Sequence, residues 1–352
     1  MSRRLEKRTA LITGAASGIG AACARRLAAE GARLLLADLD GAGAEKLAGE
    51  LGQASVQADV TRAADIERMV DAAWERWGRL DVLVNNAGIV QVKPLLEITE
   101  DDWDRIMRVN LRAAFFVLQA VARRMVRQAP IPGSELRGKL IHTASIAAYR
   151  GGQPLLGHYS ASKAGLVSVS RTAAQVLAPH RITSNCICPG AVETPMWKQI
   201  DADWTTLEGW ERGEAWKRRT AGIPLGRPEV AEDLTGLAVF LASAYSDYMT
   251  GQAVKVDGGL VVGDCDPGEN RETRSRLPRA DLPLAPDLRE GGAPGQPSSA
   301  GVSFPRGAFS GPRHRRRERR VRCARRAPCD TVRGSWATRS GSFARTVSRP
   351  SP

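Results

Sequence analysis

The 352-residue sequence has no apolar run of the ~18–20 residues that a membrane-spanning helix needs. Its N-terminus, MSRRLEKRTALITG, has a basic start but no apolar core ending in the small-residue cleavage site of a secretory signal. Hydrophobic residues make up 43% of the chain, which is enough for a globular core. These features predict a soluble, cytoplasmic protein without a membrane anchor.

Cysteine is scarce, and its spacing does not suggest a metal site. No pair among the six cysteines has zinc-ribbon spacing together with a matching second pair. Cys186 and Cys188 flank Ile187 in SNCICPG, which alternates as a strand does. We interpret these two thiols as small apolar groups in a buried strand, and we expect no bound metal.

Lysine is absent from residues 265–352, although this segment holds 19 Arg against 8 Asp plus Glu. It carries most of the net charge of +13, and residues 1–264 are nearly neutral. The segment is rich in Pro, Gly and Ser with little apolar periodicity, which predicts a disordered tail. Translation of GC-rich DNA in a shifted frame, or past a displaced stop codon, produces arginine-rich segments without lysine. We therefore favour an extension without a function. A nucleic-acid-binding tail is the alternative.

Strand-like apolar runs alternate with helical patterns through the first three quarters of the chain. The expected strands are 8–14, 33–38, 54–60, 81–88, 138–145, 181–190 and 251–259. The helical patterns between them include a long one at 99–128, with Thr99 as its N-cap. This alternation predicts a single α/β domain over residues 1–264, a Rossmann-type doubly wound parallel sheet of about seven strands.

A glycine-rich turn joins the first expected strand to the first helix. In LITGAASGIGAA, the glycines Gly14, Gly18 and Gly20 permit a tight turn, and the helix N-terminus offers free N–H groups to a pyrophosphate. Asp38 ends the second strand, where a carboxylate can accept hydrogen bonds from the adenosine ribose and repel a 2′-phosphate. No basic residue follows Asp38, and Ser17 precedes Gly18, so the turn favours NAD over NADP.

Four polar residues form a candidate catalytic set. Tyr159 and Lys163 are one helical turn apart, so they share a helix face, and a protonated lysine is expected to lower the pKa of the tyrosine. Ser145 ends a strand, where its hydroxyl could bind a substrate oxygen. Asn110 lies inside a predicted helix, which asparagine does not favour, and a water bridging it to Lys163 would explain its presence.

Taken together, these motifs resemble the short-chain dehydrogenase/reductase family over about residues 5–262. The matching segments are TGAASGIG (13–20), NNAG (85–88), Asn110, Ser145, YSASK (159–163) and PGAVETPM (189–196), in the order of the family. The resemblance implies that Tyr159 is the general acid/base, that Lys163 lowers its pKa and binds the nicotinamide ribose, that Ser145 holds the reacting oxygen, and that Asn110 holds a relay water.

The resemblance also implies an NAD cleft and a homo-oligomer, a tetramer or dimer. Asp59 and Val60 would meet the adenine, and Val192 and Thr194 the carboxamide. The full set of implied cofactor residues is Gly14, Ser17, Gly18, Ile19, Gly20, Asp38, Asp59, Val60, Asn86, Ala87, Gly88, Tyr159, Lys163, Pro189, Gly190, Val192 and Thr194.

Three features depart from the family pattern. Tyr159 follows Ser145 by 14 residues, where 13 is common in the family. The loop at 127–138 is long, and we expect it at the surface. The arginine-rich tail has no family counterpart.

The substrate is expected under a lid at 193–222, which carries Trp197, Trp204, Trp210 and Trp216 among many charges. This segment and the sequence after it are similar to those of dehydrogenases acting on sorbitol and related polyols, and acetoin/2,3-butanediol dehydrogenases share much of the pattern. The candidate substrate residues are Ser145, Gln153, His158, Tyr159 and Trp197, and His158 could equally face solvent. We expect NAD-dependent oxidation of a secondary alcohol, a polyol such as sorbitol, with acetoin/2,3-butanediol as the alternative.

Overall fold

The computed structural model describes residues 3–150 and 155–262. All of these belong to one compact unit, Met1–Ala280. The second unit, Asp281–Pro352, lies outside the described residues. So do the predicted disordered tail at 265–352 and the candidate substrate residue Gln153.

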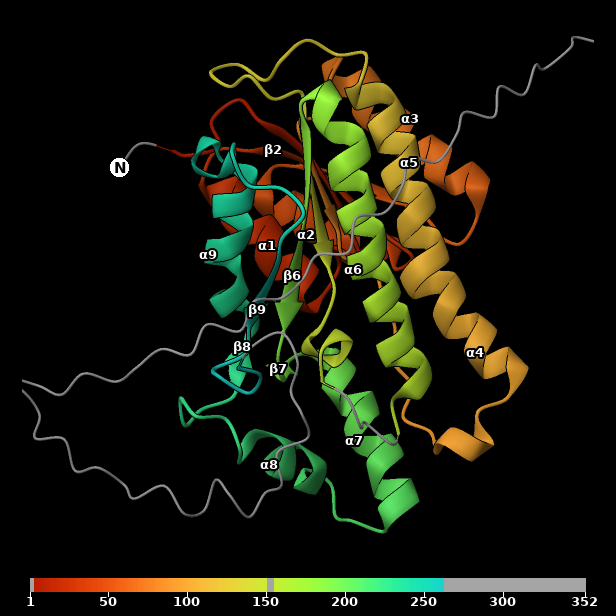
Figure 1. Ribbon diagram of the computed structural model, residues 1–352. Coiled ribbons are helices and arrows are strands. Elements are labelled where there is room, and N and C mark those ends of the chain that lie inside the picture. Colours follow the sequence, from red (N-terminus) through yellow and green to blue (C-terminus); the bar gives the residue numbers. More distant parts are fainter. Residues whose placement is uncertain (1–2, 151–154, 263–352) are drawn as a thin grey trace, which may run out of the picture. The chain divides into compact units, whose positions relative to one another are not determined.

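A seven-stranded parallel sheet forms the centre of this unit, in the order β3-β2-β1-β4-β5-β6-β9 (Figure 1). Its strands are β1 (Thr9–Thr13), β2 (Arg33–Asp38), β3 (Ala54–Gln57), β4 (Val82–Asn85), β5 (Gly138–Thr143), β6 (Ile182–Pro189) and β9 (Ala253–Val256). Every residue of β1, β4, β5 and β6 is buried, as expected for parallel strands covered on both faces. The predicted α/β fold with seven strands is confirmed, including the buried thiols of Cys186 and Cys188 in β6.

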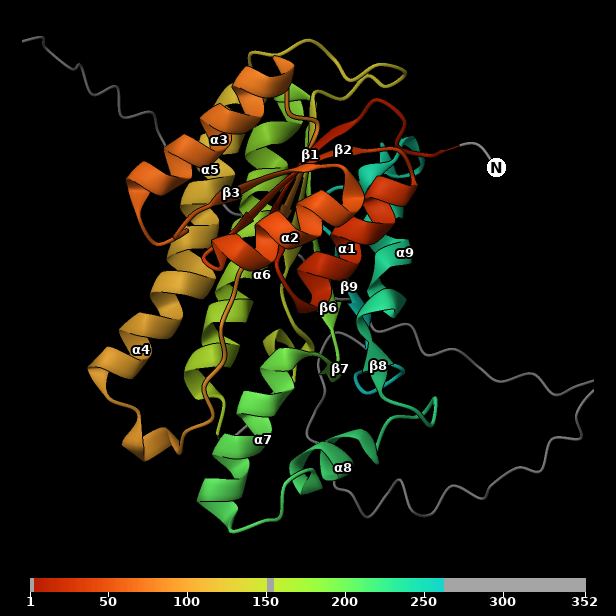
Figure 2. The ribbon, with the colours of Figure 1, turned by 180° about the vertical axis from the view of Figure 1, so that it is seen from behind.

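Helices cover both faces of the sheet (Figures 1 and 2). On one face, α1 (Gly18–Ala29), α2 (Gly41–Leu51) and α9 (Ala231–Ala242) bury alanine and leucine side chains against the strands. On the other face lie α3 (Ala63–Trp77), α5 (Ala114–Met125) and α6 (Gly157–Leu177). The expected double winding is therefore present, with a separate apolar core on each side.

The helix predicted at 99–128 is not continuous. It begins with α4 (Glu100–Met107), where Thr99 and Asp102 form a reciprocal capping box. Residues Arg108–Ala113 then adopt a π-helix before α5 starts. Asn110 lies in this wider turn and is fully buried, so the residue that disfavours an α-helix coincides with the interruption.

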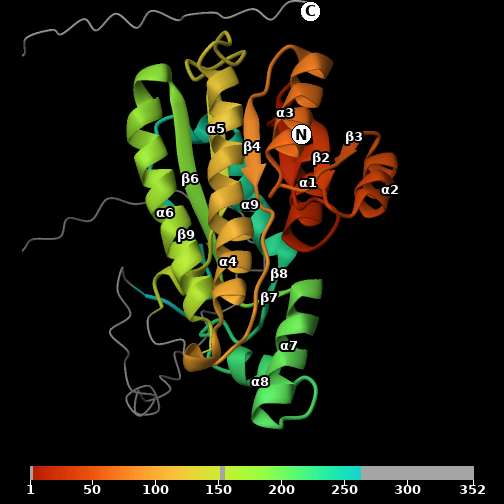
Figure 3. The same cartoon turned by 90° about the vertical axis from the view of Figure 1, so that its right-hand side faces the viewer.

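A small second sheet and two helices stand apart from the main layers (Figure 3). The strands β7 (Val192–Glu193) and β8 (Glu229–Val230) pair in parallel. Between them in sequence run α7 (Pro195–Glu208) and α8 (Glu214–Thr220). The aromatic pair Trp197–Trp216 joins the two helices, and the pair Trp204–Trp210 joins α7 to the loop between them.

Short 3₁₀ helices complete the described elements, at Leu95–Glu97, Ile146–Ala148, Ala178–His180 and Ala244–Ser246. The long loop at 127–138, which we expected at the surface, has six exposed residues of twelve and buries Gln128, Ile131 and Gly138. No helix within 3–150 and 155–262 is long and apolar enough to cross a membrane.

We expect a chain ending at residue 264 to fold and to keep its activity, because both helical layers and all seven strands lie between Thr9 and Val256. Its circular dichroism spectrum should match that of the full chain, and its Tm should be unchanged or higher. A control ending at residue 252 should lose cooperative unfolding, because it lacks β9, the partner of β6. A Tm several degrees lower for the first truncation would show that residues 265–352 support the domain.

Candidate active site

A cavity of about 470 Å³ opens at the carboxyl ends of the strands. The strand order reverses between β1 and β4, and ligands of doubly wound sheets bind at such a switch point. Every predicted cofactor residue except Gly20 lines this cavity, together with the predicted substrate residues Ser145 and Trp197. Asn110 and His158 do not line it.

The glycine-rich turn has the geometry of a phosphate-binding loop. Gly14 has φ of 65°, and a Cβ on it would lie 2.9 Å from the backbone of Ala87. A Cβ on Gly20 would lie 1.9 Å from the carbonyl oxygen of Gly14, so Gly20 serves the packing of helix on strand. Ser17 makes no side-chain capping bond at the start of α1, and the first turn holds no acidic residue. This helix N-terminus fits the pyrophosphate of a dinucleotide.

Asp38 is held rigidly at the end of β2. Its Oδ2 accepts the N–H of Ala16 at 2.8 Å, and its Oδ1 accepts the N–H of Asp40 at 2.9 Å. Asp59 and Val60, which follow the neighbouring strand β3, line the same end of the cavity. Since the carboxylate is fixed toward the cavity, it fits a ribose that carries free hydroxyls.

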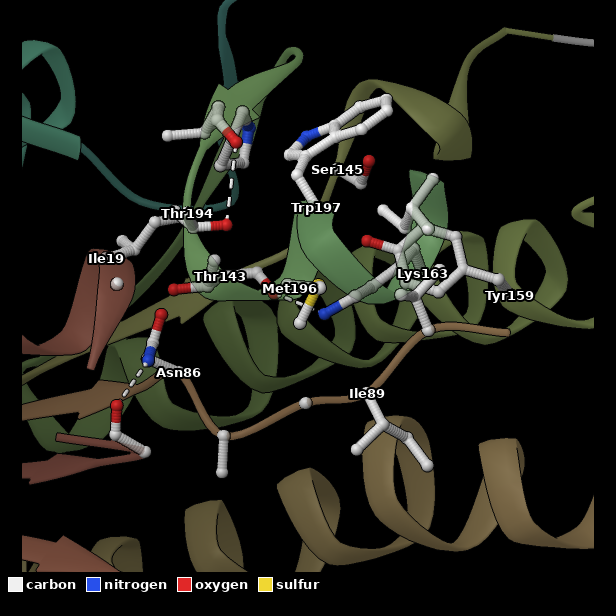
Figure 4. A pocket seen from close by; sticks show the side chains of 18 of the residues that line it. Ile19, Asn86, Ile89, Thr143, Ser145, Tyr159, Lys163, Thr194, Met196 and Trp197 are labelled. Atoms are coloured by element: carbon white, nitrogen blue, oxygen red, sulfur yellow. Dashed lines mark hydrogen bonds between the residues drawn. The ribbon is translucent and has the colours of Figure 1, made fainter. Parts of the chain in front are cut away.

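The structure brings Ser145, Tyr159 and Lys163 to one end of the cavity, with Trp197 of α7 beside them (Figure 4). Ser145 is the N-cap of the 3₁₀ turn after β5, and its hydroxyl accepts the N–H of Ala147 at 3.1 Å. Lys163, buried on α6, donates from Nζ to the carbonyl oxygen of Thr143 at 2.9 Å.

Burial, rather than the lysine charge, has the largest effect on the pKa of Tyr159. It raises the pKa of this phenol above the ordinary value, and a hydrogen bond with Ser145 acts in the opposite direction. Burial also lowers the pKa of Lys163 to about 8. Lys163 is not among the groups that shift the pKa of Tyr159 in the protein alone, so its predicted effect on that pKa stays a prediction.

Asn110 is anchored to the loop after β4. Its Oδ1 accepts the N–H of Ile89 at 2.9 Å, and its Nδ2 donates to the Ile89 carbonyl at 2.9 Å and to the Ser162 hydroxyl at 3.1 Å. A Cβ on Gly88 would lie 3.3 Å from both the Asn110 Oδ1 and the Lys163 Nζ. The absence of a side chain on Gly88 thus lets these two polar groups approach each other. The relay role of Asn110 stays a prediction.

His158 lies behind the cavity wall, on the same helix as Tyr159. It is fully buried, so the alternative of a solvent-facing histidine is wrong. Its Nε2 is 3.0 Å from Oε1 of Gln91, whose amide donates to Asp102 in the cap of α4. Burial lowers the pKa of His158. In this position it links the start of α6 to the start of α4 and does not reach into the described cavity.

Sequence reasoning missed several residues of the site. The carbonyl of Thr143 carries no side-chain signal, but its position two residues before Ser145 in the same strand run points to the cavity edge. Arg150 and Arg219 also line the cavity, and Arg219 lies at the end of the charged stretch ERGEAWKRR (211–219). From composition alone, the charged side chains of that stretch are expected to face solvent.

Glu229 in β8 is a buried carboxyl next to the cavity wall, and it too was missed. Its Oε2 accepts the N–H of Gly190 at 2.8 Å, whereas its Oε1 has no hydrogen-bond partner among the described residues. Burial raises its pKa to about 8, nearby Asp233 and Asp257 add to this, and the Gly190 bond and Arg227 oppose it. At neutral pH this carboxyl is therefore mainly protonated.

The described residues contain no cluster of side chains suited to binding a metal ion. Within residues 3–150 and 155–262, no group of three or more His, Cys, Asp or Glu side chains could hold a metal ion.

The fold and the cavity fit a dinucleotide-binding protein. Comparison with known proteins shows the family. The family described as Enoyl-(Acyl carrier protein) reductase matches residues 14–261. A sorbitol dehydrogenase of Cereibacter sphaeroides is 42% identical over 258 residues, 73% of this chain and 98% of its own. An L-2,3-butanediol dehydrogenase of Corynebacterium glutamicum is 42% identical over 72% of this chain and 98% of its own.

Solved structures agree. A short-chain type dehydrogenase/reductase from Mycobacterium marinum is 34% identical with a TM-score of 0.65, covering 74% of this chain and 98% of its own. A 3-ketoacyl-(acyl-carrier-protein) reductase from Brucella melitensis, complexed with NADH, is 34% identical with a TM-score of 0.64 over 72% of this chain and 98% of its own. The chain belongs to the short-chain dehydrogenase/reductase family.

The raised pKa of Glu229 predicts a pH-dependent stability. A carboxyl whose pKa is higher in the folded state makes the protein less stable as pH rises. The loss runs from the pKa of the unfolded state, ~4.5, to the pKa of the folded state, about 8. Glu229→Gln keeps an acceptor for the Gly190 N–H and cannot ionise. Its Tm, relative to wild type, should therefore be higher at pH 9 than at pH 5, measured by thermal unfolding. The control Glu193→Gln, at an exposed position in the paired strand β7, should show no such trend. Equal Tm differences at both pH values for Glu229→Gln would refute the prediction.

Proposed function

We propose that the protein oxidises a secondary alcohol, a polyol such as sorbitol, with NAD as hydride acceptor. The observation that carries this is the meeting of Ser145, Tyr159 and Lys163 in one cavity with the glycine-rich turn. Relatives named as sorbitol, galactitol and L-2,3-butanediol dehydrogenases, each 42% identical, support a small hydroxylated substrate. Acetoin/2,3-butanediol is the second candidate.

In this proposal several residues around the cavity each have a role in proton transfer. Ser145 holds the alcohol oxygen, and the Tyr159 oxygen takes up its proton. NAD, when bound, would supply the hydride acceptor. Lys163, fixed by the Thr143 carbonyl, holds the nicotinamide ribose and passes the proton on toward Asn110. Trp197 and the rest of the lid exclude water from the reacting carbon.

The proposed cofactor site extends from Asp38 to Thr194. Asp38, Asp59 and Val60 hold the adenosine, the α1 N-terminus with Gly14, Ser17, Gly18 and Ile19 holds the pyrophosphate, and Pro189, Gly190, Val192 and Thr194 hold the carboxamide end. Asn86, Ala87 and Gly88 form the floor between them. Residues 193–222 act as the substrate lid of a domain that ends near residue 264.

We also propose that the enzyme is a homo-oligomer, a tetramer or dimer. Phe115 and Phe116 on α5 are 37% and 39% exposed and line a groove with Leu111 of the π-helix and Val169 of α6. A second copy covering this groove would remove apolar surface from water. The relatives named above are oxidoreductases, and the comparisons lend no support to the nucleic-acid alternative.

The reaction is tested by NADH formation with sorbitol, galactitol, 2,3-butanediol and a hydroxysteroid. We expect turnover of a polyol or of the butanediol, and none of the steroid. Tyr159→Phe should lower kcat by at least ~10²-fold while leaving NADH binding, followed by fluorescence, nearly intact, since only the titrating oxygen is removed. Retention of more than a few per cent of the rate would contradict the assignment of Tyr159.

Cofactor choice is tested at Asp38. We expect kcat/KM for NAD to exceed that for NADP, because a 2′-phosphate beside this fixed carboxylate is repelled. Asp38→Ala should bring the two kcat/KM values closer together, because NAD would bind more weakly and NADP would no longer be repelled. Asp40→Ala, which removes the neighbouring carboxylate that caps α2, is the matched control and should leave the ratio unchanged. A wild-type preference for NADP would overturn the proposal.

A further inference from the structure

Glu229 binds the cavity wall through both its backbone and its side chain. Its N–H donates to the carbonyl of Ala191 at 3.3 Å, and its Oε2 accepts the N–H of Gly190 at 2.8 Å. The Gly190 N–H is shared with the carbonyl of Val256 at 2.9 Å, at the end of β9. Gly190 and Ala191 line the described cavity, whereas Glu229 does not. Glu229 therefore supports this part of the wall without reaching the cavity itself.

The packing around Gly190 brings three segments into contact. A Cβ on Gly190 would lie 2.9 Å from the Cα of Asp257 and 3.2 Å from the Glu229 Oε2. Asp257 is itself fixed, because its carboxylate accepts the N–H groups of Gly259 and Val261 at 2.9 and 2.8 Å. The turn after β6, the start of β8 and the residues after β9 thus meet at this point. Since no gap separates them, a displacement of the Glu229 carboxyl moves Gly190 as well.

The surroundings of the Glu229 carboxyl favour its neutral form. The side chain is buried, and its Oε1 has no hydrogen-bond partner within residues 3–150 and 155–262. The charged groups that act on it are Asp233 at the start of α9, Asp257 after β9, and Arg227 before β8. Arg227 already donates to both carboxylate oxygens of Asp233, each at 2.7 Å. Burial first, and then the two aspartates, raise the pKa of Glu229 to about 8.

We propose that Glu229 is a positioning residue: its neutral carboxyl holds Gly190 and Ala191 in the geometry that receives the nicotinamide end of the cofactor, and its ionisation weakens cofactor binding. This inference rests on the proposed cofactor site, in which the turn at 189–194 holds the carboxamide end. A buried carboxylate whose charge is not paired is stable only when water reaches it. Water can reach Glu229 only if its contacts with Gly190 loosen, so ionisation displaces this part of the cavity wall.

The experiment measures the Kd of NADH and of ADP-ribose, which lacks the nicotinamide, by calorimetry at pH 7 and pH 9. If NADH binds only when Glu229 is neutral, a pKa of about 8 predicts that Kd(NADH)/Kd(ADP-ribose) rises by about tenfold between these pH values. ADP-ribose controls for the adenosine end, which follows β2 and β3 at the opposite edge of the sheet from β9. It also controls for Lys163, whose pKa is about 8 and whose proposed ribose contact is common to both ligands.

Three variants separate the charge of Glu229 from its hydrogen bond. Glu229→Gln keeps an acceptor for Gly190 and cannot ionise, so its Kd ratio should stay near the wild-type value of pH 7 at both pH values. Glu229→Leu removes the acceptor and should raise the Kd of NADH by about fivefold at both pH values, with less effect on ADP-ribose. The matched control Glu232→Gln removes an exposed carboxylate in the first turn of α9 and should keep the wild-type pH dependence.

A Kd ratio that is the same at pH 7 and pH 9 in wild type would overturn the inference, and so would a rise that persists in Glu229→Gln. Equal weakening of both ligands in Glu229→Leu would also contradict it, since Glu229 would then support the fold alone. If the leucine variant does not fold, the glutamine comparison decides the question.

The outcome can be separated from that of the proposed reaction. Oxidation of an alcohol together with a Kd ratio independent of pH would refute the role of Glu229 alone. A Glu229-dependent rise in the Kd ratio without turnover of any alcohol would refute the proposed reaction and leave the role of Glu229 standing.

Discussion

The site depends on a set of hydrogen bonds that ties the carboxyl end of β4 to that of β1. The Thr13 hydroxyl accepts the N–H groups of Asn86 and Ala87, and the Asn86 amide donates to the carbonyls of Thr13 and Gly14. These bonds join the two strands at the point where the strand order reverses. They fix the glycine turn relative to the loop that passes through Gly88 to Ile89, the partner of Asn110. Both the proposed phosphate site and the proposed proton-transfer site therefore take their position from this junction.

The sequence predicted the main sheet well because its signals are local. Apolar runs such as VLVN in β4 and ITSNCICP in β6 are buried on both faces, and the glycine turn lies between a strand and a helix wherever this pattern occurs. The Tyr159/Lys163 pair needed only helical spacing to share a face. These residues lie in one cavity because the parallel strands all end at the same edge of the sheet.

The features that the sequence did not reveal depend on contacts between distant segments. The β7–β8 pair involves two residues from each strand, too few for an alternating pattern. Glu229 is polar in a polar stretch, and only the approach of Gly190 shows that it is buried. The pKa of Lys163 could not be inferred from its neighbour in the helix, because burial in the folded domain outweighs the interaction of two side chains. The sequence around His158 likewise does not indicate its hydrogen bond with Gln91, which lies in the loop after β4.

The π-helical turn at Arg108–Ala113 makes the length of its segment as important as its composition. A π-helical turn holds one residue more than an α-helical turn, so loss of one residue from it would restore ordinary helical geometry and redirect the side chains within the turn, with little rotation of the helices that flank it. The helix would remain intact and could still cover the sheet, while Asn110 would turn away from Ile89 and from the neighbourhood of Lys163. We therefore expect exchanges of residues along α4 and α5 to be tolerated more readily than the gain or loss of one residue in this turn.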